Sequence, residues 1–315
     1  MVLNKNNFIN TTLNPWTITG YVEAEGNFSI SVYKYSHRVS RSISFNIHIH
    51  SEDIIFLTII RNYFNCGTIS SISKNGHVNL TIKRIADINN IIIPFFTKYP
   101  LRGTKHLDFL LFVEAADIFS KNEHLTEKGT ARLLELKNQM NSNRDKLKFV
   151  QPVHTIINNN AYIPMDPNYI SGFSIGDAHF SLRTNSANVK NQVFGSLYYG
   201  ISQHIDNTYL LESILLAFNL ENVNIHKKTL DSIQINISNR DTIRNVIIPF
   251  FDQYPLYGMK LIAFTKVKDI INLLDSNSIN GRVKWTLELK EEILKIWDNK
   301  SSILNEDATL NVKGW

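Results

Sequence analysis

The scarcity of cysteine and of long apolar runs limits the classes of protein to which this chain can belong. Its 315 residues include one cysteine, Cys66, which excludes an intramolecular disulfide and a cysteine-based zinc site. We interpret Cys66 as a small, buried hydrophobic residue. No apolar run is long enough to span a bilayer, so we expect no membrane partner. Residues 1–12 carry neither the apolar segment of a secretory signal nor an arginine-rich presequence.

The charge of the chain is mildly basic. Its 33 Lys and Arg against 28 Asp and Glu give a net charge of +5, and the sequence pI is about 9.1. This charge is compatible with a polyanionic partner, but many proteins that bind no polyanion carry a similar charge. The length allows about two domains of ordinary size.

The chain contains an internal repeat. The segment IIIPFFTKYPL at 91–101 recurs 155 residues later as VIIPFFDQYPL at 246–256. The stretch ITGYVEAEG at 18–26 has a counterpart, ISGFSIGDA, at 170–178. Self-similarity at a nearly fixed offset indicates a tandem duplication. We therefore predict a first repeat over 1–141, a linker over 142–168 and a second repeat over 169–315.

Hydrophobic periodicity predicts the same α-β-β-α-β-β-α order in each repeat, which is an α+β fold with an antiparallel sheet. Gly26 is expected to help the backbone turn sharply from the first helix into the first strand. In the first repeat we predict helices at 15–25, 52–64, 87–96 and 104–118, strands near 27–32 and 40–48, and two short strands around an Asn-Gly turn within 74–77. In the second we predict helices at 167–177, 207–218, 241–251 and 259–274, with strands following 178 and at 193–202, 222–228 and 232–238.

One face of each predicted sheet is free of helices and unusually rich in Ser, Asn, Gln, Tyr and Arg. These side chains hydrogen-bond base edges and phosphates, although a merely polar outer face is the alternative interpretation. In the first repeat the candidate DNA-binding residues are Ser29, Ser31, Tyr33, Tyr35, Arg38, Ser40, Ser42, Ser44, Asn46, His48, Ser70 and Asn79. In the second repeat they are Ser181, Arg183, Asn185, Ser196, Tyr198, Ser202, Lys228, Ser232, Gln234 and Asn236.

The two helices that open the repeats each end on an acid. Glycine at positions 20 and 172 costs helix stability, but it would let two helices approach backbone to backbone. Glu25 and Asp177 would then come together. Two close carboxylates raise one another's pKa unless cations lie between them. Oxygen ligands suit Mg²⁺, and paired metal ions near a phosphate can activate water.

The stretches at 18–26 and 170–178 resemble the two motifs of LAGLIDADG homing endonucleases in their single-chain, pseudo-dimeric form. The segment NEHLTEKG at 122–129 also resembles fungal mitochondrial, intron-encoded members. The resemblance covers nearly the whole chain. It implies two saddle-shaped antiparallel sheets with helices packed behind them and the motif helices at the interface, in a monomer.

The resemblance also implies roles for individual residues. Glu25 and Asp177 match the catalytic, metal-binding carboxylates, with any backbone ligand left unassigned. Lys105 and Lys260 match basic residues near the scissile phosphates, and Gln203 matches a polar residue that holds water. The first repeat has Ile49 at the position of Gln203, so the two half-sites should differ. His50 and His204 are further candidates that fit a helix cap equally well.

The second motif departs from the family pattern at Ser174, where the family favours an acid, and at Ala178. Ala178 stands where the family favours glycine, which puts the local turn geometry in doubt. Ile175 stands where the first motif has Glu23, so we interpret Glu23 as a structural or solvated group of the first repeat.

The expected function is a site-specific double-strand DNA endonuclease with Mg²⁺ or Mn²⁺ as cofactor. It would cut a long, asymmetric target by phosphodiester hydrolysis, leave 3′ overhangs and promote homing of its host intron. An intron RNA maturase, with intron RNA as partner, and a non-catalytic DNA-binding protein are the alternatives. The resemblance implies a mitochondrial protein encoded within the organelle, without a presequence.

Overall fold

The computed structural model describes residues 13–36, 38–141, 156–157, 161–162, 164–184 and 195–299. Leu13–Gly176 form one compact unit, called here the N-terminal unit, and the second, the C-terminal unit, takes up the described chain from Asp177 onward. Each unit contains one four-stranded sheet, with strand orders β1-β2-β4-β3 and β7-β8-β10-β9. All of the strand pairs in these two sheets are antiparallel, so the predicted duplicated α+β fold is confirmed. Most of the predicted linker lies outside the described residues, and the repeat boundaries stay a prediction.

In the N-terminal unit the first motif helix leads directly into the sheet. The elements are α2 (Pro15–Glu25), β1 (Gly26–Tyr35), β2 (Arg38–His50), η1 (Ser51–Asp53), α3 (Ile54–Phe64), β3 (Thr68–Ile69), β4 (His77–Ile82), α4 (Ile85–Asp87), η2 (Ile88–Ile92), α5 (Ile93–Lys98), α6 (Lys105–Ser120), η3 (Glu123–Leu125), α7 (Glu127–Asn138), the short strands β5 (Ile156–Ile157) and β6 (Ala161–Tyr162), and α8 (Pro167–Asp177).

The C-terminal unit repeats this order after the second motif helix. Its elements are β7 (Ala178–Thr184), β8 (Gly195–His204), η7 (Ile205–Asn207), α9 (Thr208–Ala217), β9 (His226–Lys227), β10 (Ser232–Ile237), α10 (Arg240–Thr242), η8 (Ile243–Ile247), α11 (Ile248–Gln253), α12 (Gly258–Ser276), β11 (Ser278–Ile279), β12 (Arg282–Val283) and α13 (Leu287–Asp298).

Equivalent aromatic clusters fill the space between sheet and helices in both units. Contacting rings have centroids 5.3–5.8 Å apart in the N-terminal unit and 5.2–6.0 Å apart in the C-terminal unit. These pairs are tilted or edge-to-face, and such aromatic pairs add to the free energy gained by burying the rings. The N-terminal cluster consists of Phe28, Phe45, Phe96 and Phe109. The C-terminal cluster consists of Phe180, Tyr199, Phe251 and Phe264.

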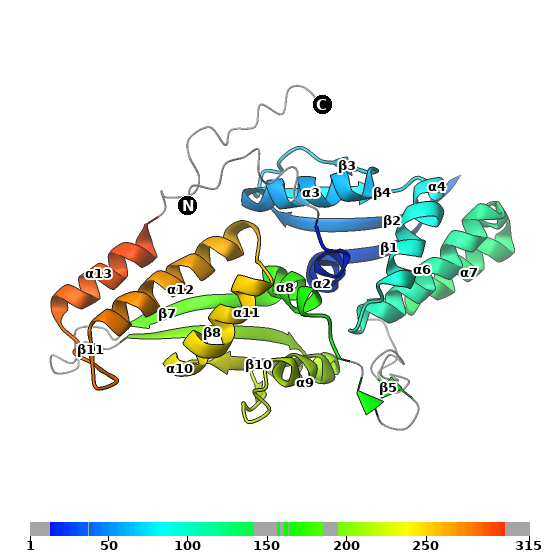
Figure 1. Cartoon of the computed structure of the whole chain (residues 1–315). Helices are drawn as coiled ribbons and strands as arrows, with labels where there is room; N and C mark the ends of the chain where they lie inside the picture. Colours follow the sequence, from blue (N-terminus) through cyan, green and yellow to red (C-terminus); the bar gives the residue numbers. More distant parts are fainter. Residues whose placement is uncertain are drawn as a thin grey trace. The chain divides into compact units, whose positions relative to one another are not determined.

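The sequence analysis misses the π-helical turns and the last helix of each repeat. A π-helical turn, η2 in one unit and η8 in the other, interrupts the helix that leads to the Pro-Phe-Phe segment. Helices α7 and α13 end the described parts of the two repeats. Each begins at a threonine whose hydroxyl accepts a backbone N–H, Thr126 from Gly129 and Thr286 from Leu289. Figure 1 shows α6 beside α7 and α12 beside α13.

The predicted Asn-Gly turn is present. Gly76 has a φ of +77°, a conformation that favours glycine, and its N–H donates to the Ser73 carbonyl at 2.9 Å. The strand before the turn, β3, comprises only Thr68 and Ile69.

Candidate active site and nucleic-acid face

Helices α2 and α8 pack backbone to backbone within the N-terminal unit (Figure 1). A Cβ added at Gly20 would lie 2.0 Å from the Tyr169 carbonyl oxygen, and one added at Gly172 would lie 2.0 Å from the Thr17 carbonyl oxygen. Real Cβ atoms do not approach so closely, so only glycine fits at either position. The close approach inferred from the two glycines is therefore confirmed.

Glu25 is the last residue of α2 and is half-buried. A Cβ added at Gly176 of α8 would lie 3.1 Å from its Cγ atom, and Asp177 is the next residue of α8. Burial raises the pKa of the neighbouring Tyr21, as do the negative charges of Glu25 and Asp53.

The expected reason for glycine at position 26 is wrong. Gly26 has φ −78° and ψ 157°, an extended conformation that any residue adopts. Glycine is needed because an added Cβ would lie 2.4 Å from Cγ1 and 2.7 Å from the carbonyl oxygen of Val22. Ala178, at the equivalent position, is buried at the start of β7 and needs no unusual backbone conformation.

Lys105, the first residue of α6, reaches back to the end of α2. Its Nζ donates to the carbonyl oxygens of Val22 at 3.0 Å and Ala24 at 3.2 Å. A cation beside the last carbonyls of a helix complements the negative end of the helix dipole. The structure thus brings Lys105 to the carbonyl that immediately precedes Glu25.

Glu23 is buried rather than solvated. Its side chain is 6% exposed, and its Oε2 accepts the backbone N–H groups of Arg102 and Gly103 and the hydroxyl of Tyr169, each at 2.9 Å. Of the two interpretations of Glu23, a structural or a solvated group, the structural one is therefore correct.

In the C-terminal unit Gln203 of β8 lies against Asp177. Gln203 Nε2 donates a hydrogen bond to Asp177 Oδ2, while its Oε1 accepts from Asn207 Nδ2 at 2.9 Å. Asn207 is buried, so this contact restricts the side-chain rotation of Gln203. The equivalent Ile49 in the other unit is buried and apolar, and it offers no such contact.

Lys260, near the start of α12, donates a hydrogen bond from Nζ to the carbonyl oxygen of Ala178. It therefore contacts the residue after the acid, whereas Lys105 contacts carbonyls before it. Burial lowers the pKa of the adjacent His179, as do the positive charges of Lys260, Lys228 and Arg183.

The outward face of the N-terminal sheet carries the predicted polar residues. Its strand register pairs Ser29 with Ser44, Ser31 with Ser42 and Tyr33 with Ser40. The intervening residues Phe28, Ile30, Phe45 and Ile47 are buried. Period-two alternation therefore separates a polar face from the core, as predicted.

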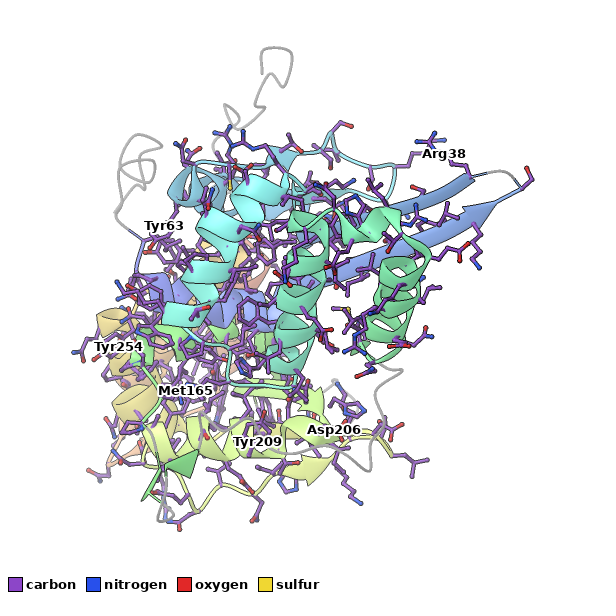
Figure 2. The ribbon with its side chains drawn as sticks, turned by 90° about the vertical axis from the view of Figure 1, so that its right-hand side faces the viewer. Arg38, Tyr63, Met165, Asp206, Tyr209 and Tyr254 are labelled. Carbon is purple, nitrogen blue, oxygen red and sulfur yellow. The ribbon has the colours of Figure 1, made fainter. Side chains whose placement is uncertain are left out.

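At the β2–β4 end of this face, His48 pairs with Asn79, and their Nδ1 and Oδ1 atoms are 2.7 Å apart. The Ser70 hydroxyl accepts the Asn79 backbone N–H at 3.1 Å. Asn46 donates from Nδ2 to the Ser44 hydroxyl at 2.9 Å. Arg38 is exposed at the outer end of the β1–β2 ladder (Figure 2). The Tyr35 side chain lies outside the described parts of the structure.

The outward face of the C-terminal sheet is polar in a different way. Ser181 pairs with Tyr198, and Arg183 with Ser196. The Arg183 guanidinium carbon lies 4.6 Å from the centroid of the Tyr198 ring, within range of a cation–π interaction.

The remaining predicted residues of this face follow the β8–β10 ladder. Ser202 pairs with Gln234, Asn236 with Gly200, and Ser232 with His204. Lys228 Nζ donates to the Ser202 hydroxyl at 3.4 Å. Asn185 lies outside the described residues.

The residues on these faces that the sequence analysis misses include Asn27, His77, Thr81 and His179. Each pairs across a ladder with an outward position, so the same alternation could have identified them. The His77 and His48 rings are stacked, with centroids 4.8 Å apart and planes 7° apart.

His50 and His204 act as helix caps. Each accepts the backbone N–H of the residue two positions later through Nδ1, at 3.4 Å from Glu52 and 3.3 Å from Asp206. Within the described ranges no group of three or more His, Cys, Asp or Glu side chains could hold a metal ion. No described helix is long and apolar enough to cross a membrane.

Comparison with known proteins gives consistent results. The family model described as LAGLIDADG endonuclease matches residues 18–116 and 170–271, which is more than half of the chain. "Probable intron-encoded endonuclease 2" of Neurospora crassa is 31% identical over 282 residues, covering 83% of this chain and 60% of that protein. The chain thus spans about three fifths of the length of this relative.

Two solved structures are similar over nearly their whole length. I-SmaMI bound to an uncleaved DNA target in the presence of calcium ions has a TM-score of 0.78 and 28% identity, covering 90% of this chain and 98% of that one. The meganuclease I-CpaMI bound to uncleaved DNA has a TM-score of 0.77 and 30% identity, covering 93% of this chain and 100% of that one.

Proposed function

The chain belongs to the LAGLIDADG endonuclease family, and we propose that it cuts both strands of DNA at one long, asymmetric site. The observation that carries this proposal is the close contact of α2 and α8, each of which ends on an acid. A lysine reaches the backbone beside each acid, Lys105 near Glu25 and Lys260 near Asp177. The two repeats thus supply two sets of the same chemical groups, one for each strand.

The carboxylates of Glu25 and Asp177 would hold divalent metal ions together with phosphate oxygens of the DNA and water. Carboxylates of this kind fit Mg²⁺ or Mn²⁺, because Mg²⁺ prefers oxygen ligands and retains several waters. When bound, the metal would lower the pKa of a coordinated water and neutralise charge on the phosphate. Lys105 and Lys260 would add positive charge at the scissile phosphates.

The two polar faces would bind the DNA in its major groove. Serine, asparagine, glutamine and arginine side chains hydrogen-bond base edges, and the arginines and lysines also contact phosphates. The faces differ at nearly every equivalent position, as when Tyr198 stands opposite Ser181 and Ser44 opposite Ser29. These differences between the two faces support an asymmetric DNA target.

We propose further that cleavage leaves 3′ overhangs and promotes homing of the host intron in a mitochondrion. One chain would act alone as a monomer, because it carries both motifs. The supports are the two-repeat sequence and the similarity to a protein named as an intron-encoded endonuclease.

The decisive experiment selects cleaved sites from a randomised duplex library in Mg²⁺, then measures both strands of the selected site. We expect double-strand cleavage in Mg²⁺ or Mn²⁺ and binding without cleavage in Ca²⁺. Glu25→Gln and Asp177→Asn should abolish cleavage while retaining DNA binding. Glu212→Gln removes an exposed acid on α9 and should cleave normally. Unchanged cleavage by Glu25→Gln would refute the proposal, and binding without cleavage by the native chain would indicate a non-catalytic DNA-binding protein.

A further inference from the structure

The Glu23 carboxylate joins three segments of the N-terminal unit. Its Oε2 accepts hydrogen bonds from Tyr169 of α8 and from the backbone N–H groups of Arg102 and Gly103, all at 2.9 Å. Glu23 itself belongs to α2 and is 6% exposed. Buried donors and acceptors are costly to leave without partners, so this junction is held firmly.

The junction lies directly beside the contacts of Lys105. Gly103 precedes Lys105 by two residues, and Lys105 Nζ bonds the carbonyls of Val22 and Ala24, the residues on either side of Glu23. The backbone before α6 is therefore fixed to α2 by Glu23, and the side chain at the start of α6 returns to α2 through Lys105. Together these contacts hold the segment 102–105 against the last turn of α2.

The second motif has no carboxylate at the position of Glu23. Ile175 occupies the position of Glu23, and its apolar side chain accepts no hydrogen bond. The segment before Lys260 contains Tyr257 and Gly258 instead of Arg102 and Gly103. Lys260 bonds the carbonyl of Ala178, a position unlike those bonded by Lys105.

We propose that Glu23, held by Tyr169, is a positioning residue that places Lys105 for the cut at one strand only. The inference rests on the proposed endonuclease function and goes beyond it, because it makes the two cuts depend on different supporting residues. Glu23 touches neither DNA nor metal in this role. It acts through the backbone at Gly103 and hence through Lys105.

Strand-resolved single-turnover cleavage tests this inference, with each strand of the selected duplex labelled separately. Tyr169→Phe removes one hydroxyl and keeps the ring, so it should fold. We expect about a tenfold slower cut of one strand, in the range seen when supporting hydrogen bonds of a site are lost. The other strand and the DNA affinity should change less than about twofold, so nicked DNA should accumulate.

Glu23→Gln and Glu23→Leu extend the test. Glutamine keeps one acceptor oxygen and should retain more of the affected cut than leucine, which keeps none. Ile175→Val, at the same position of the second motif, is the matched control and should leave both cuts unchanged. The affected strand should be the one that Lys105→Ala slows more.

Several outcomes would overturn the inference. A purely structural role for Glu23 would lower the melting temperature and slow both cuts equally, or leave both unchanged. Slowing of the strand that depends on Lys260 would also contradict it. If the native chain cuts neither strand, the proposed function fails and the inference fails with it, whereas native cutting with symmetric variant effects refutes the inference alone.

Discussion

A Cβ at residue 20 of α2 would stand 2.0 Å from the carbonyl oxygen of Tyr169 in α8. Gly172 has the reciprocal relationship with the Thr17 carbonyl, also at 2.0 Å. The helix contact is thus made by main-chain atoms from both sides. No side-chain rotation can relieve a clash with a carbonyl oxygen, so the backbones would have to separate.

Gly20→Ala or Gly172→Ala should therefore destabilise the protein, although alanine is the better helix former. Overpacking costs about 1–3 kcal/mol or more, against about 1 kcal/mol gained in helix propensity. Urea unfolding measures the difference. Gly195→Ala is the control, because its Cβ would lie 3.4 Å from the Trp285 ring, an ordinary contact. Equal stability of Gly20→Ala and the control would contradict the close contact.

Gln203→Leu should slow the cut that depends on Asp177. The substitution removes the donor to the Asp177 carboxylate and the acceptor for Asn207. Loss of such supporting hydrogen bonds typically costs about 10–100-fold in activity. Strand-resolved cleavage at saturating enzyme measures the effect, and the cut that depends on Glu25 should stay unchanged.

Gln234→Leu serves as the comparison for that variant, since Gln234 lies on the outward face of neighbouring β10. It should weaken DNA binding or relax base preference and leave the saturated rate unaltered. If Gln203→Leu instead changes only the affinity for DNA and leaves the cleavage rate unaltered, Gln203 contacts the DNA and not Asp177.

Arg183→Ala should reduce the salt dependence of DNA binding. Arg183 is exposed beside Tyr198 on the outward face of the C-terminal sheet. Loss of one phosphate contact lowers the slope of log K against log salt by about 1. Filter binding in Ca²⁺ at several salt concentrations gives the slope.

Arg132→Ala is the matched control for the salt experiment. Arg132 is also exposed, but its guanidinium is paired with Glu114 and Glu135 on helices α6 and α7. Its removal should leave the slope unchanged. An equal fall in both variants would point to net charge, and not to the polar face, as the source of the effect.

Cys66 should react slowly with thiol reagents in the native protein. The residue is 8% exposed, and burial raises the pKa of its thiol, as does the nearby Asp87. A raised pKa means that less reactive thiolate is present at any pH below it. Disulfide-exchange labelling at pH 8 should be slow until denaturant is added. As a control, an exposed cysteine introduced by Asn62→Cys in a Cys66→Ser background should react at once. If Cys66 of the native protein reacts as fast as this exposed cysteine, Cys66 is not buried.

Local pattern was sufficient to predict the sheets and the faces of their strands. Phe28 and Phe45 are buried while Ser29 and Ser44 face outward, because successive strand residues point to opposite sides. The helix contact was also predictable, since Gly20 and Gly172 are poor helix formers that recur at matching positions. These conclusions depend on residue spacing alone.

Partners far apart in sequence were not predictable. Glu23 is 79 residues from Arg102 and 146 residues from Tyr169, so no local pattern shows that its carboxylate is buried and accepts hydrogen bonds from both. The sequence indicates that Gly26 serves the turn of the backbone, whereas the structure requires glycine there because of contact with Val22. Steric reasons of this kind depend on the path of the folded backbone.

Helices α7 and α13 escaped prediction for a different reason. Their capping residues, Thr126 and Thr286, are 160 residues apart, whereas the repeated Pro-Phe-Phe segments are 155 apart. The β11–β12 hairpin precedes α13 and accounts for a changed spacing. A search at one fixed offset therefore does not match α7 with α13, although both threonines are recognisable helix caps.

The alternation along each strand has an evolutionary consequence. A mutation at an outward position such as Ser44 or Gln234 leaves Phe45 and Ile235 in place, so the aromatic clusters stay intact. Under the proposed function, each half could therefore acquire a new DNA sequence preference without a change in its buried core. A lineage of such proteins could then follow drifting insertion sites, one half-site at a time, on an unchanged scaffold.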